Sequence, residues 1–319
     1  MGQELPGPCR RLLEFQHGVI ARRQAARVGI SSRSIDNFVR RGRWQPLGWG
    51  TYAAFTGEPP RLAVLWAAVL RLGPRAILSH ETAAELDGLM DKPAPMIHVT
   101  VEGQRHLSAV PGTIVHRSGR LQCSRHPGLS PPRTMIEETV LDLTQAAATF
   151  DDAFGWISRG CQRGLTTPTL LRIRMDMRKK VRWRTELWQA LHDVDAGVHS
   201  PLEFRYVRDV ERPHRLPRAR RQARAIRQGR RQYRDALYED FGLCVELDGR
   251  VAHSVENRWL DIRRDNANAA DGIVTLRYGW SDVTKHPCEV AAEVARVLRL
   301  RGWRGRPRAC QPGCPAAIP

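Results

Sequence analysis

The chain has 319 residues, and 51 lysines and arginines against 33 aspartates and glutamates give it a formal net charge of +18. The longest apolar run, residues 62–70, is too short to cross a membrane, and the seven cysteines include no CxxC pair, so the sequence argues against a membrane protein and a disulfide-stapled secreted one. We expect a cytoplasmic protein of two or three domains with a polyanionic partner, above all nucleic acid, although a genome rich in arginine codons is an alternative origin of the charge.

The first domain, residues 1–57, has the pattern of a winged helix-turn-helix. Residues 19–28 predict a helical stretch that a glycine ends, and the serines at 31–32 would cap a second helix over residues 33–41. The aromatic residues and glycines of residues 44–55 have the spacing of a hairpin and predict the wing.

The second helix of this module carries the residues expected to contact DNA. Ile35, Phe38 and Val39 recur at helical spacing and would face the core. The outward side chains suited to phosphates and base edges are Arg33, Asn37, Arg40 and Arg41. A small helical domain with a solvated basic face is the alternative.

Four segments of the N-terminal half resemble the AbiEi-type antitoxin family, the transcriptional repressors of type IV toxin–antitoxin operons. They are residues 25–35, 78–89, 97–101 and 131–143. The resemblance implies operator binding by the winged helix, a cognate toxin as a further partner, and an α/β middle domain over residues 58–150. A helical connector, residues 151–197, follows.

One stretch of the middle domain has two interpretations. Ser79, His80 and Glu81 would either cap a helix over residues 81–86 or contribute catalytic side chains. Serine and glutamate at a helix start satisfy backbone N–H groups, so we expect capping.

The last domain, residues 198–303, mixes helices and strands in an order that predicts a sheet flanked by helices. The expected elements are a helix over residues 200–210, a strand near Tyr233, a strand over 242–248, a helix over 259–270, a strand over 273–278 and a helix over 287–300. Nine arginines crowd residues 215–234, which predicts contacts with a phosphate backbone, with a disordered basic loop as the alternative.

This domain also carries acidic residues in a pattern that predicts a metal site. Glu246 and Asp248 alternate with apolar residues and would share one face of a strand. Asp235 stands eleven residues before Glu246, as expected for two antiparallel strands joined by a short turn at residues 238–242. Such oxygen ligands, with Glu203 either as a further member or only as a helix-capping residue, suit Mg²⁺ or Mn²⁺ better than zinc.

Three further residues would complete a phosphodiester-cleaving site. His253 follows the acidic strand and would position or deprotonate a water molecule. Either Arg258 or Arg264 would stabilise the pentacoordinate phosphate. The alternative for His253 is an exposed loop residue.

The motif set of residues 198–303 resembles the PD-(D/E)XK nuclease superfamily and, within it, the Vsr-like endonucleases. The resembling segments are Asp235, residues 245–253, residues 258–266, residues 276–280 and residues 282–283. The resemblance implies a restriction-endonuclease-like α/β fold with Asp235 and Glu246 as metal ligands. Asp248 replaces the lysine of the superfamily signature, which makes His253 the candidate general base.

The sequence therefore predicts an α+β multi-domain protein that binds DNA and cleaves it with Mg²⁺. The alternative is a non-enzymatic repressor or antitoxin with an inactive nuclease fold, and a third hypothesis makes RNA the substrate. Cys310 and Cys314 are spaced too widely for a usual zinc knuckle, and we expect residues 304–319 to be a flexible tail.

Overall fold

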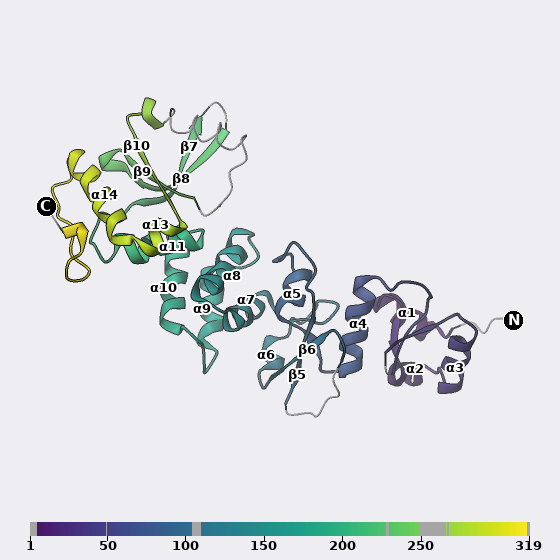
Figure 1. Cartoon of the computed structure of the whole chain (residues 1–319). Helices are drawn as coiled ribbons and strands as arrows, with labels where there is room; N and C mark the ends of the chain where they lie inside the picture. Colours follow the sequence, from purple (N-terminus) through teal and green to yellow (C-terminus); the bar gives the residue numbers. More distant parts are fainter. Residues whose placement is uncertain are drawn as a thin grey trace. The chain divides into compact units, whose positions relative to one another are not determined.

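The computed structural model describes residues 5–48, 50–103, 110–227, 230–248, 266 and 268–317, with backbone alone at residues 225–227 and 230–232. The chain divides into two compact units (Figure 1). Unit 1 comprises Met1–Ala146 and Arg163–Lys179, and unit 2 comprises Ala147–Gln162 and Lys180–Pro319. Both combine helices and sheets, as the predicted α+β class requires.

The N-terminal part of unit 1 is a helix-turn-helix with a small antiparallel sheet. Its elements are α1 (Gly7–Phe15), β1 (Val19–Ala21), α2 (Arg22–Arg27), α3 (Ser32–Arg40), β2 (Gln45–Gly48) and β3 (Thr51–Ala53). The strands lie in the order β1-β3-β2, so the predicted wing hairpin is present. The predicted helical stretch over residues 19–28 is wrong at its start, because residues 19–21 are buried and pair with β3 as a strand.

The rest of unit 1 surrounds a second three-stranded sheet. Its elements are α4 (Arg61–Leu72), β4 (Ile77–Leu78), α5 (His80–Leu86), β5 (Ile97–Glu102), β6 (Thr113–Ser118), α6 (Leu121–Ser124), α7 (Ile136–Ala146) and α9 (Pro168–Asp176). The strands lie in the order β4-β5-β6, with β4 antiparallel and β6 parallel to β5.

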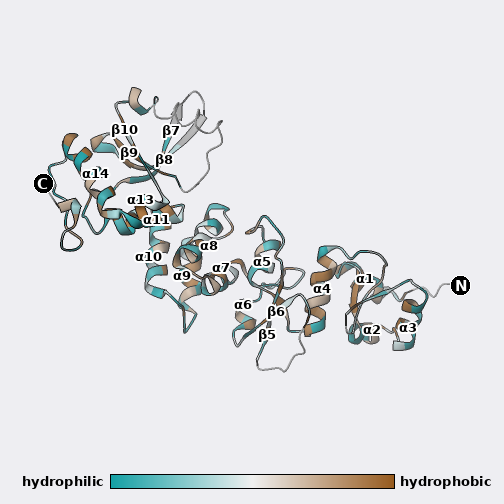
Figure 2. Ribbon diagram, viewed as in Figure 1, coloured by the Kyte–Doolittle hydropathy of each residue, from teal (hydrophilic) through white to brown (hydrophobic). Residues whose placement is uncertain are grey.

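The apolar run at residues 62–70 lies in α4, whose hydrophobic character Figure 2 shows, and this helix is buried on two faces. Ala63, Trp66 and Leu70 pack with Val19 and Ala21 of the wing sheet. The opposite face packs on the second sheet. A helix with two buried faces needs an apolar sequence all round, which accounts for the run. Among the described residues no helix has both the length and the apolar character to cross a bilayer.

Unit 2 contains helices and one four-stranded mixed sheet. Its elements are α8 (Phe150–Gln162), α10 (Arg184–Asp195), α11 (Pro201–Arg205), the π-helical turn η1 (Tyr206–Glu211), β7 (Arg220–Arg227), β8 (Arg230–Tyr238), the 3-10 turn η2 (Glu239–Phe241), β9 (Leu243–Asp248), β10 (Val274–Gly279), α13 (Trp280–Lys285), α14 (Pro287–Leu300) and the 3-10 turn η3 (Pro315–Ala317). The strand order is β10-β9-β8-β7. Of the region predicted as a helical connector, α8 and α10 belong to unit 2, whereas α9 belongs to unit 1.

Strand β9 runs through the middle of this sheet. It is antiparallel to β8, with Ala236 opposite Val245, and parallel to β10, with Leu276 opposite Val245. The turn between β8 and β9 closes at Gly242, whose φ of 55° is the left-handed conformation that glycine adopts most easily. The apolar side chains of β9 pack in the core with α14, so its acidic residues lie on the opposite face.

Two parts of unit 2 differ from the sequence-based expectations. The arginine-rich segment forms β7 and the start of β8, which pair with each other, so the alternative of a disordered basic loop does not apply to the paired residues. The tail after α14 has little regular structure but is anchored, because Cys314 and Ala316 are buried in the core.

Candidate functional sites

Helix α3 presents a basic surface in the orientation that its sequence predicts. The Ser31 hydroxyl accepts a hydrogen bond from the Ser34 N–H at 3.1 Å, so Ser31 is the N-cap. Ile35 and Phe38 are buried, and Phe38 packs on Trp44 with 5.0 Å between the ring centroids. The predicted DNA-contacting residues lie on the accessible side: Arg33, Arg40 and Arg41 are exposed and Asn37 is half-buried.

An ion pair holds α3 against the start of α2. Arg22 lies 3.1 Å from the Asp36 carboxylate and also donates a hydrogen bond to the Tyr52 hydroxyl of β3. Asp36 would otherwise place an uncompensated negative charge beside the outward arginines. The positive charge of Arg22 offsets the negative charge of Asp36 and so reduces the repulsion between Asp36 and a phosphate backbone bound to the arginines.

Two acidic residues of unit 2 lie on neighbouring strands. Continuing the pairing of Ala236 with Val245 places Asp235 of β8 opposite Glu246 of β9. The Asp235 carboxylate accepts hydrogen bonds from the Leu247 N–H at 2.8 Å and from the Gln222 side chain at 3.2 Å. Gln222 lies on β7 with a φ of 45°, an unusual value for a residue with a side chain. The Asp235 side chain thus links its own strand β8 to both neighbouring strands, β7 and β9.

Glu203 lies in α11, close to Asp235. Its side chain is buried, and it accepts a hydrogen bond from the His199 N–H at 3.0 Å, while the Ser200 hydroxyl caps the helix at the Glu203 N–H. Burial raises the pKa of Glu203 to about 7, and the negative charge of Asp235 adds to the rise. Glu203 is therefore more than a capping residue: it is a buried acid whose ionisation depends on its neighbours.

The acids do not form a preassembled metal cage. Among the described residues, two groups bring three or more acidic, histidine or cysteine ligand atoms within 4.8 Å of one another, and Glu203, Asp235, Glu246 and Asp248 are in neither. Glu246 instead accepts a hydrogen bond from the Cys244 thiol at 3.3 Å. Carboxylate oxygens are the ligands that Mg²⁺ prefers. His253, Arg258 and Arg264 lie outside the described residues.

Half of the arginines of residues 215–234 whose side chains are described make structural contacts. Arg220 pairs with Glu239 at 2.6 Å, and Arg234 bonds to Asn268 at 2.9 Å. Arg221 forms a buried ion pair with Glu211. The exposed arginines of this segment that remain for a phosphate backbone are Arg215, Arg218 and Arg224.

Unit 1 contains a cluster of three histidines that the sequence did not predict. His80 of α5 stacks on His116 of β6 with 3.7 Å between ring centroids, and His98 of β5 lies 3.0 Å from His116 between ring nitrogens. Burial lowers the pKa of His80 to about 3 and that of His116 to about 4. The rings are therefore neutral at pH 7, the form in which imidazole binds metals.

The expected capping by Ser79 is wrong. Its side chain makes no capping hydrogen bond to the backbone N–H groups at the start of α5; the hydroxyl lies 3.0 Å from Nδ1 of His80 and accepts a hydrogen bond from Thr100 at 2.7 Å. Ser79 and Thr100 orient the histidine cluster instead. The parallel pairing of β5 with β6, which sets His98 beside Ile114 and Thr100 beside His116, creates this contact and has no signature in local sequence.

Residues 10–54 match the family described as transcriptional regulator, AbiEi antitoxin. The matched region runs from α1 to the end of β3 and so contains the helix-turn-helix and the wing. No curated protein matches the chain. The match supports a DNA-binding regulator or antitoxin and agrees with the basic outward face of α3.

Proposed function

We propose that this chain is a DNA-binding protein whose C-terminal domain cleaves phosphodiester bonds with Mg²⁺. The observation that carries the proposal is the placement of Asp235 and Glu246 on adjacent antiparallel strands, with the buried acid Glu203 beside Asp235. Two strand carboxylates at one sheet position are suited to hold a divalent cation. The net charge of +18 provides affinity for the nucleic-acid backbone.

The residues of this site would have different roles in metal binding and proton transfer. Asp235, fixed by the Leu247 N–H and Gln222, and Glu246 would hold the ion. The ion, when bound, would neutralise developing charge on the phosphate and lower the pKa of a water molecule. Glu203 would exchange a proton near pH 7, because its pKa lies at about that value. Asp248 occupies the position of the superfamily lysine, and His253 stays the proposed base.

We expect the purified protein to nick or cut plasmid DNA with Mg²⁺ or Mn²⁺, and Glu246→Ala to abolish the cutting while DNA binding persists. The reason is that removing one of two ligands leaves the ion weakly held. Gel analysis of the plasmid measures cleavage, and a filter-binding assay without metal measures affinity. Glu239→Ala is the matched control, since Glu239 is an exposed acid of the same unit. Equal cleavage by Glu246→Ala, or no cleavage by the unsubstituted protein, would contradict the proposal.

A second function is a non-enzymatic repressor or antitoxin. The match of residues 10–54 to the AbiEi antitoxin regulators favours it, and so does the fact that, among the described residues, no three acids of unit 2 bring ligand atoms within 4.8 Å of one another. The winged helix would bind an operator through α3, and the C-terminal domain would serve binding or assembly. A cognate toxin would then be the protein partner.

Arg40→Ala is expected to weaken binding to the DNA upstream of the protein's own gene by about tenfold, because it removes a cationic donor from the outward face of α3. Titration of a labelled fragment at several salt concentrations measures the affinity and its salt dependence. Lys92→Ala changes the charge equally on an exposed residue outside the winged helix and should leave the affinity unchanged. An equal loss in both variants would argue for non-specific attraction alone.

A further inference from the structure

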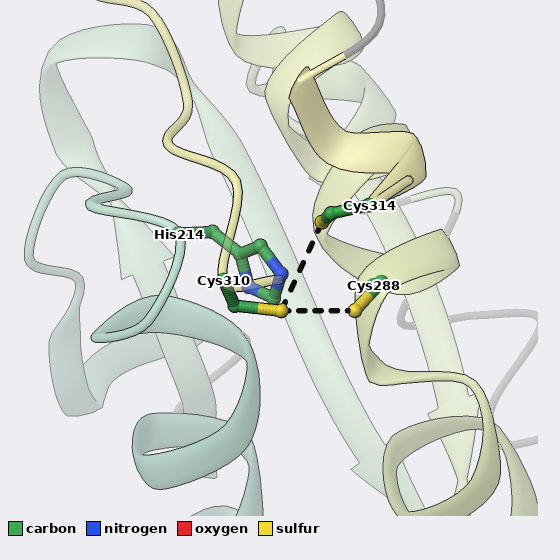
Figure 3. A group of neighbouring side chains, drawn as sticks. All are labelled: His214, Cys288, Cys310 and Cys314. Atoms are coloured by element: carbon green, nitrogen blue, oxygen red, sulfur yellow. Dashed lines mark hydrogen bonds between the residues drawn. The ribbon is translucent and has the colours of Figure 1, made fainter. Parts of the chain in front are cut away.

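Four potential metal ligands converge in unit 2, and none of them is one of the acidic residues of the proposed cleavage site. His214 follows η1, Cys288 begins α14, and Cys310 and Cys314 lie in the tail (Figure 3). One ligand atom from each residue lies within 4.8 Å of all the others. The Cys310 sulfur is 3.4 Å from that of Cys288 and 3.9 Å from that of Cys314.

The distances between the sulfur atoms fit a shared metal ion. A disulfide bond would require about 2.05 Å between two sulfurs. A tetrahedral zinc ion with Zn–S bonds of about 2.3 Å holds its sulfur ligands about 3.8 Å apart. The two sulfur–sulfur distances match the second arrangement.

His214 gives an independent indication of a ligand. Its side chain is completely buried, and its Nδ1 atom lies 2.8 Å from the Val210 carbonyl oxygen, so Nδ1 carries the proton. The other ring nitrogen, Nε2, is buried without a nitrogen or oxygen partner among the described residues. Because Nδ1 is occupied by the carbonyl oxygen, Nε2 is the nitrogen left to act as a ligand beside the three sulfurs. Metal-binding histidines commonly have this arrangement, with one nitrogen on the metal and the other on a carbonyl oxygen.

We propose that His214, Cys288, Cys310 and Cys314 bind one structural Zn²⁺ ion. Three thiolates and one imidazole form a donor set typical of structural zinc, and all four positions are filled by the protein, so the site leaves no position for a substrate. The soft sulfur ligands exclude Mg²⁺. The site is separate from the proposed cleavage site and does not depend on its activity.

The ion would fasten the tail to the body of unit 2. Beyond α14 the tail buries Cys314 and Ala316, and the Arg308 N–H donates a hydrogen bond to the His214 carbonyl at 2.8 Å. Zinc would link the tail, α14 and the segment after η1 at one point, and much of its binding free energy would stabilise the folded unit.

The full-length protein, purified without a chelator, is expected to contain one zinc ion per chain by elemental analysis. Replacement of zinc by Co²⁺ should give the visible absorption of a tetrahedral cobalt–thiolate centre. Cys310→Ser should lose the bound metal and this absorption. Cys123→Ser is the matched control, since Cys123 is exposed in unit 1, and it should retain both.

A second measurement on the unsubstituted protein keeps the test valid if Cys310→Ser does not fold. Cys310 is exposed, yet zinc should protect it from alkylation until a chelator is added, whereas Cys123 should react in both conditions. Protection of Cys310 from alkylation that disappears when the chelator is added supports the zinc site. Protein that holds no zinc after reconstitution, equal alkylation of Cys310 with and without chelator, or a disulfide between Cys288 and Cys310 in the mass spectrum would overturn it.

Discussion

Arg221→Met is expected to lower the free energy of unfolding of unit 2 by about 3–5 kcal/mol, because it leaves the Glu211 carboxylate buried without its cation. The two side chains are 5% and 6% exposed, and the ion pair joins β7 to η1. Glu211 also accepts a hydrogen bond from the Tyr238 hydroxyl at 2.9 Å, and Tyr238 in turn contacts the Tyr206 hydroxyl at 2.9 Å. The substitution would therefore disturb a buried network rather than one pair.

The measurement is urea unfolding, with amide hydrogen exchange in β8 and β9 as a local probe of unit 2. Arg220→Met is the matched control, because Arg220 lies on the same strand and pairs with Glu239 in an exposed ion pair. Its loss should cost about 0–1 kcal/mol. The buried network would have no special role if both variants were destabilised equally.

Unit 1 is expected to lose stability as the pH falls from 7 to 5, owing to the histidine cluster. The pKa of His80 is about 3 in the folded protein, below its ordinary value of 6.5, because burial and the neighbouring His116 and His98 disfavour its charge. The unfolded chain therefore binds more protons below pH 6.5. The stability that unit 1 gains by keeping His80 neutral is fully present above pH 6.5 and is lost as the pH falls toward 3.

His80 alone accounts for about 2 kcal/mol of this loss between pH 7 and 5, since each pH unit below 6.5 costs about 1.4 kcal/mol. His116 acts in the same direction, with a folded pKa of about 4. Hydrogen exchange of the β5 amides at both pH values, with a chelator present, reports the stability of unit 1. His80→Asn should reduce the difference, because asparagine does not titrate and tolerates the φ of 49° at this position. An unchanged difference in His80→Asn would exclude the cluster as its origin.

Local patterns in the sequence predicted the elements whose packing is local. The helix over residues 287–300 has the predicted bounds, because a proline starts it and apolar residues recur along one face. The pairing of β8 with β9 follows from a short turn that a glycine closes. The apolar face of α3 likewise follows from its helical spacing.

Strand β7 could not be predicted, because its arginine-rich sequence lacks the apolar alternation of a half-buried strand. Its place at the edge of the sheet depends on β8 and on the distant Glu211, which the fold brings to Arg221. The strand at residues 19–21 was missed for a similar reason: its partner β3 lies about thirty residues further along.

In the candidate sites, too, the sequence predicted what depends on local pattern and not what depends on distant contacts. The sequence located Asp235 and Glu246 on facing strands but could not determine where their carboxylates point, since Gln222 and the Leu247 N–H orient Asp235. The histidine cluster of unit 1 and the histidine–cysteine group of unit 2 could not be predicted, because the members of each come from different parts of the sequence. Cys310 and Cys314 are close in the sequence, but His214 and Cys288 are distant from them and join them only through the fold.

The two buried faces of α4 determine where this chain can be divided. A fragment ending at residue 57 would keep the whole helix-turn-helix and wing but would leave Val19, Ala21, Leu47 and Phe55 without the helix that covers them. Such a fragment would expose apolar surface and tend to aggregate. The smallest portion suited to isolating the winged helix therefore includes α4, and with α4 the second sheet on which its other face rests.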